Sequence, residues 1–378
     1  MLRCAVFSLS LAPIVSLSER ASTASLTLLP STTLGRCLDG TPSGFYFLNQ
    51  SSTKFVIAFD GGGECNSAAS CQSKVSSSLG SSKYFSKSND FDDAGQWFLD
   101  TDTTRNPGFA DWNKVRVPYC TQDLHMGTKA TANASTFGLF FSGQLVYEAI
   151  LSELDALGLR DATDILLSGE SAGGIAVWPK LDATAARYPS ARVSGAPVAG
   201  YYFYSDPYTG PNATGGGLAS FSPAGLDELY SLYAPSLNGA CVAAFEGDPS
   251  PCMLSNYSLP FVQAPVFVTE SLSDSVQLTA HDDIPEQYRT LPPEIAYIKA
   301  WEANMSAALE PVLGVGSSPS HGGFAAACWV HTTFTSSAPL INGLSFLQVA
   351  AKWYGSSGEY KVADTCGAPF CNPTCPPN

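Results

Sequence analysis

The feature that most constrains the fold is the stretch from Asp164 to Gly174, which reads DILLSGESAGG. An apolar run typical of a buried strand ends in Gly-x-Ser-x-Gly, and a helical pattern follows it. This arrangement is that of a nucleophile elbow, a sharp strand-to-helix turn that lifts a serine hydroxyl clear of a sheet. The stretch therefore predicts an α/β fold with Ser171 as a nucleophile. An ordinary Gly-Ser turn is the alternative.

The N-terminus has the layout of a secretory leader. A basic start at Arg3 precedes an apolar run from Cys4 to about Leu17, which is too short to span a bilayer. We predict a signal peptide over residues 1–20. No linker or internal repeat divides the rest, so residues 21–378 are predicted to form a single domain. No later apolar run is long enough for a transmembrane anchor, so we expect a protein secreted to the extracellular space or a cell wall.

Cysteine usage agrees with secretion. Of the 11 cysteines, Cys4 lies in the predicted signal peptide and would be removed with it. An even number of cysteines then remains, which predicts a disulfide framework. Spacing favours the local pairs Cys65–Cys71 and Cys241–Cys252. Metal binding by the C-terminal cysteines is the weaker alternative, because no histidine lies among them. The disulfide candidates are Cys37, Cys65, Cys71, Cys120, Cys241, Cys252, Cys328, Cys366, Cys371 and Cys375.

Asn-x-Ser/Thr sequons point in the same direction. Together with a signal peptide they indicate a glycoprotein of the secretory pathway. The candidate sites are Asn49, Asn133, Asn212, Asn256 and Asn304.

The chain is acidic, with 33 Asp and Glu against 19 Lys and Arg and a net charge of −14. Nucleic acid is therefore excluded as the expected partner, because phosphate binding needs a basic surface. A polyanionic substrate would also be repelled unless a local basic patch offset the field.

Strand and helix patterns alternate along the chain. This alternation predicts an α/β-hydrolase-like fold: a mainly parallel central sheet with helices on both faces and long, disulfide-bearing loop insertions. Residues 66–110 have little periodicity and are predicted to be a long surface excursion. Strands are expected at 44–48, 54–59, near 115–120, before the elbow and at 264–270, and helices at 140–157, 171–188, 226–233, 295–309 and 343–354.

A serine nucleophile needs a histidine base, which a carboxylate must orient. In α/β-hydrolases the chain order is nucleophile, acid, histidine. Asp274 lies just beyond the predicted strand at 264–270 and fits the acid, with Asp282 and Asp283 as competitors. His321 and His331 both remain as the base, since His281 is too close to Asp274 in sequence.

The oxyanion of an acyl-transfer reaction must be met by backbone amides. Ala172, directly after the nucleophile, is the first candidate. Gly62 and Gly63, in the glycine run after the 54–59 strand, are the others, because glycine lets the backbone approach a substrate closely. A phosphate-binding loop is the rival interpretation, but the lysine and Ser/Thr of a P-loop are missing.

Several blocks, in order along the chain, resemble the pectin acetylesterases and the related carboxylesterase Notum. The DGGGECN run at 60–66 is similar to the family's Gly-Gly-Gly-Trp-Cys-Asn loop, and GESAGG at 169–174 to its Gly-x-Ser-Ala-Gly-Gly motif. The block ending in Tyr119-Cys120 also fits. SDSVQ at 273–277 resembles the family's acid block, and CWVH at 328–331 its histidine segment. The resemblance implies a triad of Ser171, Asp274 and His331, with His321 in reserve.

The same resemblance implies a serine carboxylesterase that needs no metal or organic cofactor. Its implied substrate is an acylated carbohydrate such as pectin, carrying O-acetyl or short acyl esters. The family's aromatics in the oxyanion loop and the acid block are Glu64 and Val276 here, so the substrate pocket is expected to differ. A Notum-like deacylase of a lipidated protein and a non-catalytic secreted glycoprotein are the alternatives. We expect a monomer.

Overall fold

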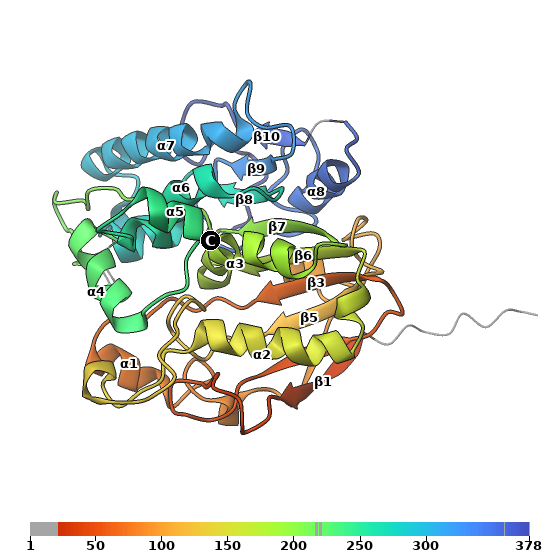
Figure 1. The fold of residues 1–378 in the computed structure, drawn as a ribbon. Helices are drawn as coiled ribbons and strands as arrows, with labels where there is room; N and C mark the ends of the chain where they lie inside the picture. Colours follow the sequence, from red (N-terminus) through yellow and green to blue (C-terminus); the bar gives the residue numbers. More distant parts are fainter. Residues whose placement is uncertain (1–21, 216–217, 219–220, 359, 378) are drawn as a thin grey trace, which may run out of the picture.

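The computed structural model describes residues 22–215, 218, 221–358 and 360–377. The predicted signal peptide, with Cys4, lies outside these residues. Within them the strands form one sheet in the order β10-β9-β8-β7-β6-β3-β5-β2-β1-β4, which rises from β1 at the bottom of Figure 1 to β10 at the top. The strands are β1 (Thr23–Leu28), β2 (Gly44–Leu48), β3 (Lys54–Phe59), β4 (Ser88–Asp90), β5 (Asn113–Val117), β6 (Asp164–Glu170), β7 (Arg192–Val198), β8 (Phe267–Ser271), β9 (Gly322–Ala326) and β10 (Lys361–Ala363).

The sheet has a parallel and an antiparallel half. From β5 through β3 and β6 to β10 the pairings are parallel. Beyond β5, the strands β2, β1 and β4 pair antiparallel. The carboxyl ends of parallel strands meet at one edge, which is where α/β folds place their sites. The predicted mainly parallel α/β-hydrolase architecture is confirmed.

Helices cover both faces of this sheet, as predicted. Alternate residues of the central strands point to opposite faces, so each face has its own apolar core. On β6, for example, Ile165 and Leu167 join the core under α2, α3 and α7, whereas Leu166 joins the core under α8. The helices are α1 (Ala68–Lys74), α2 (Gly143–Ala156), α3 (Ala172–Arg187), α4 (Pro223–Tyr233), α5 (Gly239–Ala244), α6 (Ser255–Ser258), α7 (Pro292–Leu313) and α8 (Phe346–Tyr354).

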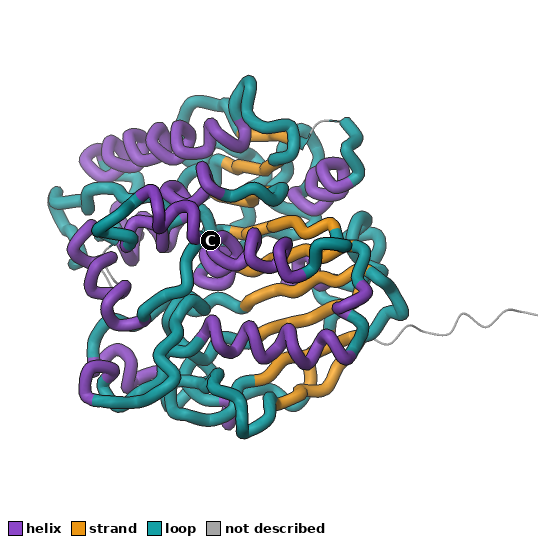
Figure 2. Tube along the Cα trace, in the orientation of Figure 1, coloured by secondary structure: helices purple, strands orange, loops and turns teal. Residues whose placement is uncertain are grey.

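Loops and short helices gather at the left ends of the strands in Figure 2, where α4, α5 and α6 lie. A third apolar cluster fills this layer and joins Tyr119 and Phe141 to Leu229 and Tyr233 of α4. The layer therefore has an apolar core of its own, and the loops beside the strand ends pack on this core.

Residues 66–110 differ from the prediction of a surface excursion. They contain α1, β4 and a 3₁₀ segment at 94–99, and the rings of Phe91, Phe98 and Phe109 are buried in the core shared with α8. The Ser- and Gly-rich composition hides these widely spaced aromatics, which have no periodicity because each is placed by its tertiary partners.

All ten cysteines of the predicted framework form disulfides. The local pairs Cys65–Cys71 and Cys241–Cys252 are confirmed. Of the three C-terminal cysteines considered for metal, Cys366 and Cys371 pair with each other and Cys375 pairs with Cys328. The full set is Cys37–Cys120, Cys65–Cys71, Cys241–Cys252, Cys328–Cys375 and Cys366–Cys371. No helix in the described part of the chain is long and apolar enough to cross a membrane.

Candidate active site

Ser171 lies at the turn between β6 and α3. Its backbone has φ 55° and ψ −124°, and its amide donates a hydrogen bond to Val198 O at 3.0 Å. The flanking glycines are required by space: a Cβ on Gly169 would lie 2.4 Å from Gly173 O, and one on Gly173 would lie 2.0 Å from Phe59 O. The predicted strand–turn–helix geometry is thus present, with the serine displayed at the carboxyl edge of the sheet.

Asp274 and His331 lie together at the same edge. They follow the parallel neighbours β8 and β9, and His331 Nδ1 is 2.7 Å from Asp274 Oδ2. A backbone hydrogen bond of 3.1 Å from Ser275 N to Val330 O holds the two loops together. The other carboxylate oxygen of Asp274 accepts the Gln277 amide at 2.8 Å. The carboxylate is therefore fixed while it orients the imidazole.

The electrostatic surroundings favour a charged imidazole at His331. Burial lowers its pKa, but the Asp274 charge, the hydrogen bond to that carboxylate and the Glu170 charge outweigh burial and raise it. His331 Nε2 is buried and has no hydrogen-bond partner among the described residues. This nitrogen lines the cavity that contains Ser171 and is available to take a proton there.

The glycine run forms a wall of that cavity directly after β3. Gly62 and Gly63 have φ of 143° and 72°, conformations that favour glycine. The amide of Gly61 is occupied, because it donates to Glu170 Oε1 at 2.6 Å. Burial raises the pKa of Glu170 to about 7. Together these contacts fix the loop beside the serine and leave Gly61 out of the predicted set of oxyanion donors.

The cavity has a volume of about 380 Å³ and brings all six predicted catalytic and oxyanion positions except Asp274 to one surface. Asp274 is completely buried behind His331. The walls of the cavity combine apolar and polar side chains. They are formed by Gly61, Gly62, Gly63, Glu64, Glu170, Ser171, Ala172, Ile175, Tyr202, Leu218, Val276, His281, His331 and Thr332.

Two of these residues were missed by sequence reasoning. Tyr202 lines the cavity beside Ser171, and burial raises the pKa of that tyrosine well above its usual value. His281, set aside because it is close to Asp274 in sequence, lies in the cavity wall with its ring stacked on Phe221 at 4.2 Å between centroids. No local pattern marks either residue, since both reach the site only through tertiary packing.

The other two histidines occupy structural positions. His321, the reserve base, accepts the Val266 amide at Nδ1 over 3.2 Å and is not part of the cavity wall. His125 Nε2 lies 2.9 Å from Asp60 O, and burial lowers the pKa of His125 to about 3. His125 therefore stays neutral and donates to the carbonyl that begins the glycine loop.

Comparisons with known proteins identify the family of this chain. A family model described as Pectinacetylesterase matches residues 17–376. Pectin acetylesterase 7 of Arabidopsis thaliana is 29% identical over 367 residues, covering 90% of this chain and 89% of the relative. Palmitoleoyl-protein carboxylesterase notum1' of Xenopus laevis is 28% identical over 367 residues, covering 90% of this chain and 72% of that protein.

The fold has a solved counterpart. The structure of the Wnt deacylase Notum from Drosophila superposes with a TM-score of 0.81 at 24% identity, covering 94% of this chain and 100% of that chain. This coverage is in keeping with the family match over nearly the entire sequence. The chain belongs to the pectinacetylesterase family of carboxylic ester hydrolases.

Proposed function

We propose that the protein is a secreted serine esterase that removes acetyl or short acyl groups from a polysaccharide such as pectin. Ser171 is the nucleophile, His331 the general base and Asp274 the residue that orients the base. The observation that carries the proposal is His331 itself: one ring nitrogen is held by Asp274 at 2.7 Å, and the other faces the cavity of Ser171 without a partner among the described residues.

The reaction follows from these positions. Ser171 Oγ transfers its proton to His331 Nε2 and attacks the ester carbonyl. The amides of Gly62, Gly63 and Ala172 stabilise the oxyanion. His331 then protonates the departing sugar oxygen, and the acyl group stays on the serine. A water molecule, deprotonated by His331, hydrolyses this acyl-enzyme and restores the free serine.

The lining of the cavity favours a short acyl group. Ile175 and Val276 are apolar, but Glu64 is only 4% exposed in the same wall and His281 adds an imidazole. A long alkyl chain would have to lie against these polar side chains, which offer it a poorer surface than an apolar wall would. An acetyl group needs only the apolar space next to Ser171.

Acetate release from acetylated pectin, xylan and mannan tests the proposal, with Ser171→Ala as the matched control. Serine-dependent release from one polymer identifies the reaction and the substrate together. Absence of release from all three, while a fluorophosphonate probe still labels Ser171, would reject the polysaccharide and keep the esterase. Absence of both release and labelling would favour a non-catalytic glycoprotein.

Deacylation of a lipidated protein is the second candidate, because relatives named palmitoleoyl-protein carboxylesterases match 90% of this chain. A series of 4-nitrophenyl esters separates the two functions. The short-acyl proposal requires kcat/KM to be highest for acetate or butanoate and to fall for octanoate and longer chains. A maximum at long chains would support the lipid deacylase.

Secretion, glycosylation and a monomeric state are part of the same proposal. Asn49, Asn133, Asn212 and Asn304 are exposed, as glycan acceptors must be. Asn256 is half-buried, and its Oδ1 accepts the Tyr201 hydroxyl at 3.3 Å, so we expect this sequon to remain empty. Mass spectrometry of tryptic glycopeptides from the secreted protein measures each occupancy, and size-exclusion chromatography with light scattering measures the oligomeric state.

A further inference from the structure

A second cavity, of about 400 Å³, lies next to the catalytic one. The two cavities share Gly61 and Glu170 in their walls. Its other walls come from the antiparallel half of the sheet and its border. Tyr46 of β2 lies opposite Arg116 of β5 in the strand register, and both line the cavity, as does the segment 78–86.

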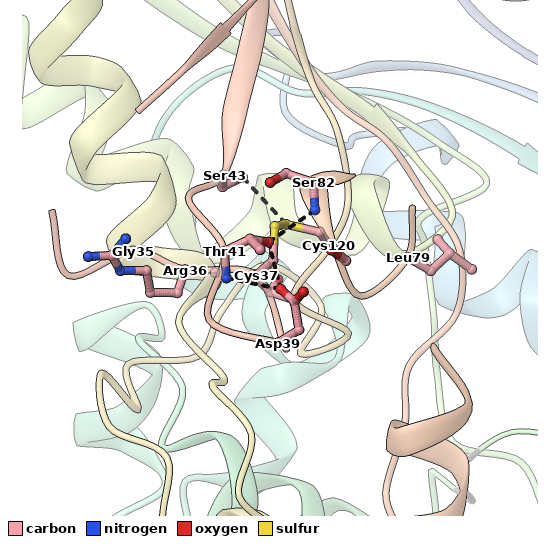
Figure 3. Close-up of a disulfide and its surroundings, with 12 residues drawn as sticks. Gly35, Arg36, Cys37, Asp39, Thr41, Ser43, Leu79, Ser82 and Cys120 are labelled. Atoms are coloured by element: carbon pink, nitrogen blue, oxygen red, sulfur yellow. Dashed lines mark hydrogen bonds between the residues drawn. A yellow bond between two sulfur atoms is a disulfide. The ribbon is translucent and has the colours of Figure 1, made fainter. Parts of the chain in front are cut away.

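The segment 78–86 is hydrogen-bonded to a loop that a disulfide anchors (Figure 3). The Cys37–Cys120 disulfide joins parts of the chain that are 83 residues apart. Beyond Cys37 the chain turns back, so that the Cys37 amide donates to Thr41 O at 2.9 Å. The Thr41 hydroxyl then accepts the amide of Ser82 at 3.1 Å. The cavity wall is thus preorganised, which lowers the entropic cost of ligand binding.

The cavity offers one aromatic face and several polar groups. The Tyr84 ring is 54% exposed at its rim. Arg116 donates from Nε to Asp60 at 2.8 Å and from Nη1 to Asn89 Oδ1, which holds the guanidinium still. Its Nη2 makes no hydrogen bond to a described residue, so two N–H donors are left for a ligand.

The charges in this cavity balance one another. Arg116 supplies the single guanidinium of the wall, and it is already paired with Asp60. Glu170 adds a second carboxyl group. An anionic ligand would meet no net positive charge here, whereas a hydroxyl-bearing ligand can both donate to the carboxyl oxygens and accept from the guanidinium.

We propose that this second cavity is a subsite for an uncharged pyranose ring, adjoining the acylated unit whose ester lies at Ser171. The CH-lined face of the ring stacks on Tyr84, and its hydroxyls exchange hydrogen bonds with Arg116 and the neighbouring polar groups. The ring is either a neutral sugar or a uronosyl unit whose carboxylate is esterified. The inference rests on the proposed function, because it takes the substrate to be a carbohydrate chain.

The test compares kcat/KM for acetylated oligosaccharides with kcat/KM for 4-nitrophenyl acetate, which is too small to reach the subsite. Three oligosaccharides are used: acetylated xylo-oligosaccharides, and acetylated oligogalacturonides with and without methyl esters. Tyr84→Ala should lower the ratio of the two constants by about five- to tenfold. Tyr84→Phe, which keeps the ring, and Tyr288→Ala, which removes an exposed ring outside both cavities, should change it by less than about twofold.

Each outcome decides a separate point. An unchanged ratio in Tyr84→Ala would overturn the subsite, and a preference for the unesterified galacturonide would overturn the uncharged ring. If the wild type releases no acetate from any oligosaccharide, the proposed function fails. The subsite is then decided by saturation-transfer NMR of the same oligosaccharides with Ser171→Ala and Ser171→Ala/Tyr84→Ala. Binding lost only in the double variant supports it, and absent or equal binding overturns it.

Discussion

The two halves of the sheet contribute different parts of the site. The parallel half places the proposed reacting groups, since Ser171, Asp274 and His331 follow β6, β8 and β9 at one edge. The antiparallel half contributes no reacting group, but with β5 it forms the wall of the second cavity through Tyr46 and Arg116. Under the two proposals, the parallel half carries out the ester hydrolysis, and the antiparallel half selects the sugar that carries the ester.

The halves also differ in how they are held. β6 and its neighbours are buried on both faces, so their loops start from fixed points. The segment 78–86 has one 3₁₀ turn, at Ser82–Tyr84, and is hydrogen-bonded to the loop that the Cys37–Cys120 disulfide anchors. Changes in the parallel half should therefore affect every ester alike, whereas changes in the antiparallel half should affect stability and substrate choice.

The largest expected effect comes from removing a reacting group. Ser171→Ala and His331→Ala should each lower kcat about 10³-fold or more for every ester, because nucleophile and base act as a unit. Stopped-assay acetate release and 4-nitrophenyl acetate turnover measure this loss. The melting temperature should stay within a few degrees, since neither side chain supports the core.

His321→Ala is the matched control for the base. His321 accepts the Val266 amide and is outside the cavity, so its loss should cost about 1 kcal/mol of stability and leave kcat unchanged. Full turnover in His331→Ala together with loss of turnover in His321→Ala would show that the base has been assigned to the wrong histidine.

Asp274→Asn, also in the parallel half, should lower kcat somewhat less than the loss of Ser171 or His331 does. The amide can still accept the Gln277 amide hydrogen, but it no longer stabilises the imidazolium or fixes the tautomer of His331. We expect a kcat reduction of about 10³-fold. Because the Asp274 charge raises the pKa of His331, the titration of that histidine should move to lower pH, which NMR of the imidazole measures. An unshifted titration would contradict this account of the pKa.

Opening the Cys37–Cys120 disulfide tests the contribution of the antiparallel half separately from that of the reacting groups. Replacing Cys37 and Cys120 by serine opens a loop of 83 residues and should cost about 2–4 kcal/mol of unfolding free energy. The ratio of oligosaccharide to 4-nitrophenyl acetate activity should fall as well, because segment 78–86 loses its anchor. Urea denaturation and the two assays measure these effects.

The Cys241–Cys252 pair is the control for that variant. Its sequence separation is only 11, so the chain-entropy cost of opening it is smaller. These cysteines line neither cavity. Replacing them should leave the ratio of oligosaccharide to 4-nitrophenyl acetate activity unchanged. If this ratio fell equally in both disulfide variants, the effect would come from a general loss of stability of the fold.

The sequence predicted the central strands of the sheet better than its edge strands, and in the antiparallel half the bounds of β2 match the predicted 44–48. The elbow combines a strand period, a turn signal and a helix period in one short stretch, and the observed bounds of β3 match the predicted 54–59. By contrast β4 has three residues, and its register with β1 depends on a segment more than 60 residues away. Short edge strands of this kind lack a local pattern, because their partners specify them.

The same reason explains what was found and missed in the site. Ser171 and the glycines are bound to local backbone geometry, so a motif reveals them. Tyr202 and His281 reach the cavity through the loop layer, and only packing brings them there. The choice of His331 over His321 could not come from spacing; it needed the family resemblance, and the His331–Asp274 hydrogen bond supports it.

The smallest expected effect concerns Glu170, which lies between the two cavities. General-base catalysis needs neutral His331, so kcat/KM should rise with pH as His331 loses its proton. The Glu170 charge raises the pKa of His331. Glu170→Gln keeps an acceptor for the Gly61 amide but removes that charge, so the rise in kcat/KM should move to lower pH by up to about one unit.

The free energy of unfolding should also depend on pH through the protonation of Glu170. Burial raises the pKa of Glu170 to about 7, so the folded state holds this proton more tightly than the unfolded state does. The wild type should therefore lose stability as pH rises from about 4.5 to 7. Glu170→Gln should remove part of that loss, as should Asp282→Asn, since burial also raises the pKa of Asp282 to about 7. Only Glu170→Gln should shift the activity profile, because Asp282 does not act on the pKa of His331. Equal shifts in both variants would show that the profile reports global stability.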